Sequence, residues 1–138
     1  MSTQRPARLF VPACAAALAI ALTGCGTGAD RTQVRAVTTR FFSALDAKQR
    51  HDACAQLTPS LRKSIEQEHS AAQCTEAVSK LTVRGSAVRL VRVYATSARV
   101  GLGSGESVFL SAMRDGWRID ALGCQPRSHG PYDCQEQG

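Results

Sequence analysis

The sequence predicts an α+β fold in which N-terminal helices pack on a curved antiparallel sheet. Apolar residues between 31 and 81 recur at spacings of three and four, which is the period of a helix. After Leu81 the apolar residues alternate every second position in a segment rich in Val and Arg, which is the period of a strand. Helices that all precede the strands are typical of the α+β class. A chain of 138 residues has room for one such domain.

The amino-acid composition and the absence of common catalytic motifs exclude several classes of function. The formal net charge is +6 and hydrophobic residues make up 43%, which is typical of a globular domain. Aromatic residues make up only 5%, which argues against nucleic acid as a partner bound by ring stacking. The sequence has no Gly-rich phosphate loop, no His-Glu-x-x-His pair and no Gly-x-Ser-x-Gly turn. We therefore expect no cofactor and no catalytic metal.

Residues 1–24 are expected to be a signal peptide. Arg5 and Arg8 precede an apolar run of 14 residues, Leu9 to Leu22. A membrane-spanning helix needs about 20 apolar residues, so the run is typical of a secretory signal.

The sequence Leu22-Thr23-Gly24-Cys25 that follows resembles the lipobox of bacterial lipoproteins. In that family a diacylglyceryl group is attached to the Cys thiol, and the signal is cut so that Cys becomes the first residue. The resemblance makes Cys25 the lipid-attachment site, residues 25–29 a tether, and the membrane a partner through two acyl chains. A plain secretory signal or a short uncleaved anchor is the alternative.

Four cysteines remain for the exported domain, because Cys14 lies in the signal and Cys25 takes the lipid. An even number in an exported chain predicts disulfides, and four cysteines allow three pairings. Nearness in sequence favours the pairs Cys54–Cys74 and Cys124–Cys134.

A zinc site made by Cys124, His129 and Cys134 is the alternative for two of these cysteines. The close Cys-x2-Cys spacing of zinc ribbons is absent, so disulfides are favoured.

The helical half is read from its apolar spacing and its start signals. The first helix is expected over 31–48, followed by a polar break at 49–52 and a helical turn at 53–57. Thr58-Pro59 predicts the start of a second helix that buries Leu61 and Ile65 and ends near Glu68. Residues 70–73 fit a capping box that opens a short helix to Leu81. The apolar face of the first helix holds Val34, Val37, Phe41, Ala44 and Leu45.

The strands are read from two turns. Asp115-Gly116, taken as a two-residue type I′ loop, pairs Ala112 with Ile119. A three-residue loop at 103–105 pairs Val100 with Val108. Whether 87–102 is one bent strand or two stays open, with a turn near Thr96. The face expected to meet the helices holds Val108, Leu110, Ala112, Trp117, Ile119 and Ala121.

The sequence at this point resembles the NTF2-like superfamily, the cystatin-fold α+β cone. Three features carry the resemblance: a helix containing Phe41-Phe42, the short helices after it, and late strands ending in Asp115-Gly116-Trp117-Arg118-Ile119. This last strand, followed closely by Cys124, is similar to the closing strand of small actinobacterial lipoproteins of that superfamily. The resemblance covers 30–125. It implies a sheet curved around the first helix with a cone-shaped pocket between them. Residues 126–138 are expected to form a polar tail held by the second disulfide.

Three aromatic residues are candidates for the lining of that pocket: Phe41, Tyr94 and Trp117. Each also fits an ordinary core position. Arg92 would share the inward face with Tyr94 if the strand ran unbroken through Thr96, and it would then bind an anionic ligand.

Some members of the superfamily are hydrolyases or isomerases. Asp46, His51 and Asp52 are the group in which a general base could be imagined, with Tyr94 as hydrogen-bond donor. These residues fall at the end of the first helix, where charge is normally solvated, so we expect no catalytic residue.

The leading functional hypothesis is therefore a membrane-anchored, extracytoplasmic lipoprotein that binds an envelope protein or a small ligand without catalysis. A small NTF2-like enzyme that uses the cone pocket is one alternative. Electrostatic attachment to an anionic wall polymer is another.

Overall fold

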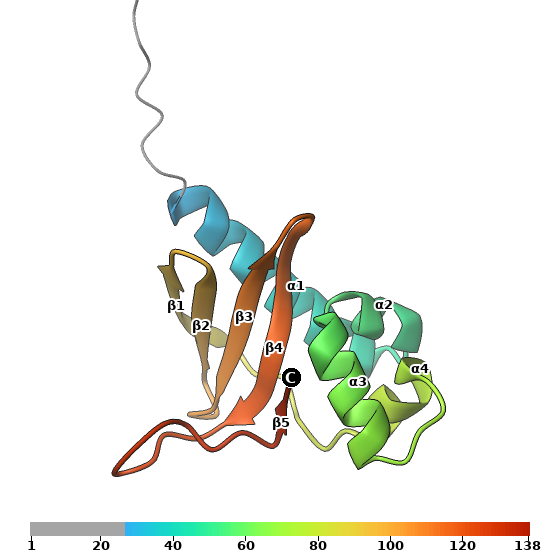
Figure 1. Ribbon diagram of the computed structural model, residues 1–138. Helices are drawn as coiled ribbons and strands as arrows, with labels where there is room; N and C mark the ends of the chain where they lie inside the picture. The colour runs from blue at the N-terminus through green and yellow to red at the C-terminus, as the bar shows by residue number, and fades with distance from the viewer. Residues whose placement is uncertain (1–26) are drawn as a thin grey trace, which may run out of the picture.

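The computed structural model describes residues 27–138, so the expected signal peptide and Cys25 lie outside the described residues. Helix α1 (Thr27–Asp46) runs behind a five-stranded antiparallel sheet, and the shorter helices gather beside one end of α1 (Figure 1). This arrangement confirms the α+β class. Within 27–138, no helix is both long and apolar enough to span a membrane.

Helix α1 begins before the expected start and ends before the expected end. It buries the apolar face that its spacing predicted, including Val34, Val37 and Phe41. The helix ends because Lys48 adopts a left-handed conformation, with φ of 57°. The Lys48 amide then donates to the Leu45 carbonyl at 3.0 Å and the Gln49 amide to the Ala44 carbonyl at 2.8 Å, which is the Schellman pattern.

Helix α2 (Arg50–Ala55) occupies most of the polar break expected at 49–52, so that expectation is wrong. Helix α3 (Pro59–Glu68) confirms its start signal. The Thr58 hydroxyl oxygen accepts a hydrogen bond from the Leu61 amide at 3.2 Å, and Leu61 and Ile65 are buried.

Helix α4 (Cys74–Ala77) continues into a 3-10 turn, η1 (Val78–Lys80). The capping box expected at 70–73 is wrong, because Gln73 is the N-cap and its side chain makes no capping bond. The Glu76 carboxylate accepts from the Ala72 amide at 3.2 Å instead.

The sheet follows chain order throughout, β1-β2-β3-β4-β5. Residues 87–102 form two strands rather than one, because the chain reverses at residues 95–96 and Tyr94 pairs with Ser97. The strands are β1 (Val88–Tyr94), β2 (Ser97–Leu102), β3 (Ser107–Met113), β4 (Gly116–Cys124) and β5 (Glu136–Gln137).

The register of the first expected hairpin is confirmed, and that of the second is wrong by two residues. Val100 pairs with Val108, as expected. Ala112 pairs with Trp117 rather than Ile119. A type I′ turn needs positive φ at both central residues, and Asp115 does not have it, so the loop moves back to 114–115. Since side-chain direction repeats every two residues, this shift leaves the expected faces in place as far as Ile119. The irregularity between Phe109 and Leu110 then exchanges the faces of β4, so that Leu122 rather than Ala121 joins the core.

The space between α1 and the sheet is filled by side chains. Buried side chains from β2, β3 and β4 meet the apolar face of α1 in one continuous core. Trp117 is buried as expected, whereas Ala112 is exposed near the end of its strand. Among the largest fully buried side chains are Phe41, Leu57, Leu61, Ile65, Leu110, Ile119 and Leu122.

Two disulfides add covalent links between segments of the fold. Cys54–Cys74 joins α2 to α4, and Cys124–Cys134 joins the end of β4 to the tail. These are the two pairings that nearness in sequence favoured. Closing loops of 20 and 10 residues stabilises the fold by about 3 kcal/mol each in the chain-entropy treatment. Because Cys124 and Cys134 are bonded to each other, neither is a free thiolate for zinc.

Candidate functional site

The three aromatic candidates do not line one pocket. Phe41 is fully buried and Trp117 is 4% exposed, both in the core, whereas Tyr94 is 53% exposed. The turn at 95–96 fixes which side of β1 faces inward: Val91 and Val93 pack on the core. Tyr94 therefore lies on the outer face, and the expectation that it faces inward is wrong. Arg92 lies on the same outer face, because the strand does not run unbroken through Thr96.

Trp117 has a structural partner of its own. Its indole N–H donates to Asp30 Oδ1 at 3.1 Å, which ties the first turn of α1 to the start of β4. Phe41 packs edge-on against Phe42 with ring centres 5.2 Å apart. Both interactions stabilise the packing of the core, and neither Phe41 nor Trp117 lines a ligand pocket.

The group considered as a catalytic base is at the surface. Asp46, His51 and Asp52 are all exposed, and none has a side-chain hydrogen bond or ion pair within residues 27–138. Tyr94 lies on the far face of the sheet. The structure does not bring these residues together with an aromatic donor.

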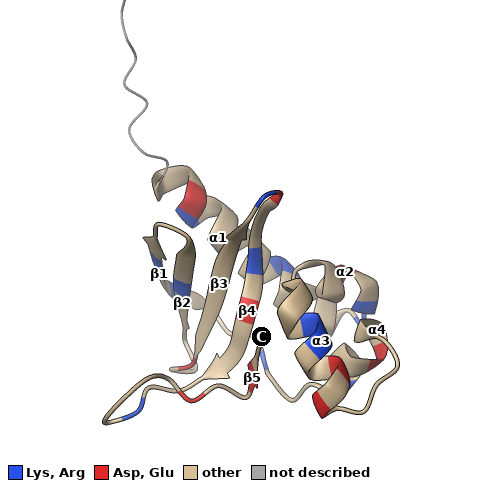
Figure 2. Ribbon diagram, in the orientation of Figure 1, with Lys and Arg blue, Asp and Glu red and all other residues tan. Residues whose placement is uncertain are grey.

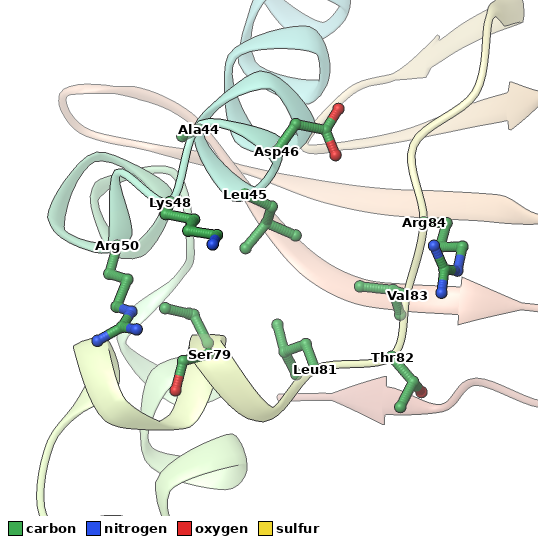
Figure 3. A pocket seen from close by; sticks show the side chains of 11 residues that line it. Ala44, Leu45, Asp46, Lys48, Arg50, Ser79, Leu81, Thr82, Val83 and Arg84 are labelled. Carbon is green, nitrogen blue, oxygen red and sulfur yellow. The ribbon is translucent and has the colours of Figure 1, made fainter.

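A pocket of about 460 Å³ opens between the C-terminal end of α1, the turn η1 and the segment 81–84 (Figure 3). Leu45, Val78 and Leu81 form an apolar floor, and polar and charged groups make up the larger part of the lining. The lining residues are Ala44, Leu45, Asp46, Lys48, Arg50, Val78, Ser79, Leu81, Thr82, Val83 and Arg84.

Cations lie on opposite sides of this floor. Figure 3 shows Lys48 and Arg50 on one side, Arg84 on the other, and the leucine side chains between them. Asp46 is the single acid in the lining, so the four charged residues sum to +2. An apolar floor with a net positive rim suits an anionic ligand that has an apolar body.

The position of Lys48 costs the fold some stability. It is one of two non-glycine residues with positive φ in the described part of the chain. Such a conformation costs an L-residue roughly 1–2 kcal/mol, and glycine avoids the cost. A lysine at this αL position, with its side chain at the pocket rim, therefore marks this cap as a candidate functional position.

A second hollow, of about 750 Å³, runs along the exposed side of α1. Arg35 and Arg40 line it together with small residues, among them Ala36, Thr39 and Ser43. Its two cations and one acid, Asp52, give a smaller net positive charge than the three cations and one acid of the pocket beside η1, which is therefore the better candidate for an anion.

A part-buried contact between His69 and Glu136 lies outside both hollows. His69 Nε2 is 2.8 Å from Glu136 Oε1, so it joins the end of α3 to β5. Burial raises the pKa of the Glu136 carboxyl; the His69 hydrogen bond lowers it, and the nearby Glu68 raises it further. Glu136 Oε2 is buried without a partner. This pair holds the tail and does not reach the pocket.

Sequence reasoning missed the pocket because its walls come from separate segments. The stretch 81–84 was expected to lead into strands, and Lys48 and Arg50 were assigned to the helix end and the break. The available signal was weak. Lys48 and Arg50 lie on either side of the expected end of the first helix, and the third basic residue, Arg84, is distant in sequence. Only folding brings them to one opening.

This chain matches no known protein family, no curated protein sequence and no solved structure.

Proposed function

We propose that this chain is an exported lipoprotein, anchored through Cys25 on the extracytoplasmic face of a membrane, whose domain binds an anionic amphiphile. Its two disulfides fit an extracytoplasmic protein, since such links persist in oxidising compartments. The sequence Leu22-Thr23-Gly24-Cys25 supports the lipid anchor. A long helix on one face of an antiparallel sheet is compatible with an NTF2-like origin, which stays part of the proposal.

The observation that carries the ligand class is the composition of the pocket. Leu45 and Leu81 offer an apolar surface, while Lys48, Arg50 and Arg84 offer positive charge around it. A carboxylate or phosphate head with a hydrocarbon body satisfies both. A neutral ligand would leave the rim unused, and a cation would be repelled by it.

Binding is favoured over catalysis by where the acids and histidines lie. A general base needs a shielded place beside its substrate. Asp46, His51 and Asp52 are exposed, and the volume between α1 and the sheet is occupied by side chains. Asp46 lines the pocket beside η1, but it is exposed and has no aromatic donor beside it, so binding is the function that we propose.

The lipid anchor is tested by replacing Cys25 with Ala in the full chain. The variant is expected to stay unprocessed or to leave the membrane fraction. Mass spectrometry of the wild-type N-terminus should find a diacylglyceryl group on Cys25. A Cys25→Ala protein that fractionates with membranes as the parent does would contradict the anchor.

The pocket is tested with decanoate, a ten-carbon carboxylate, against decyltrimethylammonium of the same chain length. Titration calorimetry below the micelle concentration should show binding of decanoate alone. Arg50→Gln and Arg84→Gln should each weaken it about two- to fivefold, the usual strength of a solvent-exposed charge contact.

Lys63→Gln is the matched control, because Lys63 is exposed on α3 and outside the pocket. Equal binding of both amphiphiles, or equal loss in all three variants, would contradict the proposed ligand class.

A further inference from the structure

The outer face of the sheet is covered over only one half. Tyr132 of the tail lies edge-on against Phe109, with ring centres 5.0 Å apart, and Arg99 donates a hydrogen bond to the Tyr132 hydroxyl. The Cys124–Cys134 disulfide holds the tail near this position. The tail therefore shields the half of the face near the β2–β3 turn.

The other half, at the β1–β2 and β3–β4 turns, is uncovered. Tyr94 at the end of β1 and Met113 at the end of β3 are 53% and 39% exposed, although most large hydrophobic side chains of the described chain are buried. The two turns lie side by side, since the Ala112 amide donates to the Thr96 carbonyl at 2.9 Å.

Two arginines flank these apolar side chains. Arg92 is exposed on β1, two residues from Tyr94, and Arg114 is exposed in the β3–β4 turn beside Met113. Figure 2 shows a basic and an acidic residue at the tip of the β3–β4 turn. The acid there, Asp115, is neutralised by Arg118 at 2.6 Å. We call Arg92, Tyr94, Met113 and Arg114 the turn-end surface.

The start of α1 lies at this same end of the molecule (Figure 1). The bond from Trp117 to Asp30 fixes it beside the β3–β4 hairpin. Cys25 precedes the first helical residue, Thr27, by two positions in the sequence. Two residues span at most about 7 Å, so a lipid on Cys25 would hold this end at the lipid headgroups.

We propose that the turn-end surface docks on the anionic headgroups of the membrane that holds Cys25. The proposal rests on the lipid anchor of the proposed function. Tyr is enriched at membrane interfaces, and arginines near the surface are attracted to anionic lipids. Tyr94 and Met113 enter the interface, while Arg92 and Arg114 contact phosphate groups. The ligand pocket then lies at the far end of α1, about 30 Å of helix away.

Trp117 provides the readout, because it is the single tryptophan of the chain and lies beside the β3–β4 turn. The lipidated full chain is reconstituted in phosphatidylcholine vesicles with or without phosphatidylglycerol. A lipid with a nitroxide on its headgroup quenches nearby indole fluorescence. Quenching of Trp117 should be stronger with phosphatidylglycerol and should fall as salt is raised.

The variants separate docking from simple anchoring. Arg92→Gln and Arg114→Gln should each lower the docked-to-undocked ratio about fivefold in anionic vesicles. Tyr94→Ser and Met113→Ser should lower quenching in both vesicle types. Leu90→Ser is the matched apolar control, since Leu90 is 38% exposed on the same strand as Tyr94 but far from the turn, and it should change nothing.

Flotation of the vesicles reports the anchor independently of quenching. Wild-type protein that does not float would overturn the anchor and the docking together. Protein that floats, but whose Trp117 quenching is the same in both vesicle types and in all variants, would overturn the docking alone. Circular dichroism of each variant checks that the fold is intact.

Discussion

Replacing Lys48 with Gly should make the domain more stable and its pocket weaker. Lys48 occupies the left-handed position that ends α1, with φ of 57°, and its side chain lies at the pocket rim. Glycine adopts this conformation without steric cost, so the Schellman bonds to Leu45 and Ala44 remain while the strain disappears.

The size of the gain follows from two opposing terms. The left-handed conformation costs an L-residue roughly 1–2 kcal/mol. Glycine lowers this gain by about 0.5–1 kcal/mol, because a chain with glycine loses more conformational entropy on folding. The difference lies between about 0 and 1.5 kcal/mol, and its midpoint, about 0.75 kcal/mol, corresponds to roughly 2–4 °C in melting temperature for a domain of this size.

The assay is urea unfolding beside decanoate titration, with Lys48→Ala as the matched control. Alanine removes the same charge but keeps the Cβ that causes the strain. Both variants should therefore lose about two- to fivefold in decanoate affinity, and only Lys48→Gly should gain stability. If Lys48→Gly is no more stable than Lys48→Ala, the strain argument is refuted. If neither variant changes affinity, Lys48 has no part in the pocket.

Three further predictions concern the fold. Trp117→Phe should cost about 1 kcal/mol in urea unfolding through loss of the bond to Asp30, and adding Asp30→Ala should cost less than the sum of the two single changes. Replacing Cys124 and Cys134 together with Ser should cost about 3 kcal/mol and expose the tail to protease, and an unchanged melting temperature would contradict this. Because burial raises the pKa of Glu136, the native state keeps that proton to higher pH than the unfolded chain does. Its stabilising contribution is therefore present below about pH 4.5 and is lost as the pH rises through the native pKa, so Glu136→Gln should flatten the stability profile above about pH 4.5.

The local rules held where a single segment decided the outcome. Thr58-Pro59 started α3 because an N-cap hydroxyl and a proline act on the adjacent backbone alone. The loop at 103–105 set the register of β2 on β3 for the same reason. The β3–β4 register was missed because two turns differing by two residues satisfy the same face pattern.

The sequence by itself determined the α+β class, the helical face that holds Phe41 and the apolar face of β3 and β4, because periodicity is a local property of the chain. The signal peptide at residues 1–24 stays a prediction, and the two disulfides fit it. Only the tertiary structure decided that Tyr94 points outward, since one tight turn at 95–96 reverses the strand and selects which face of β1 meets the core. The pocket, too, depends on tertiary structure: Lys48, Arg50 and Arg84 meet around one floor only when α1, η1 and the segment 81–84 pack together.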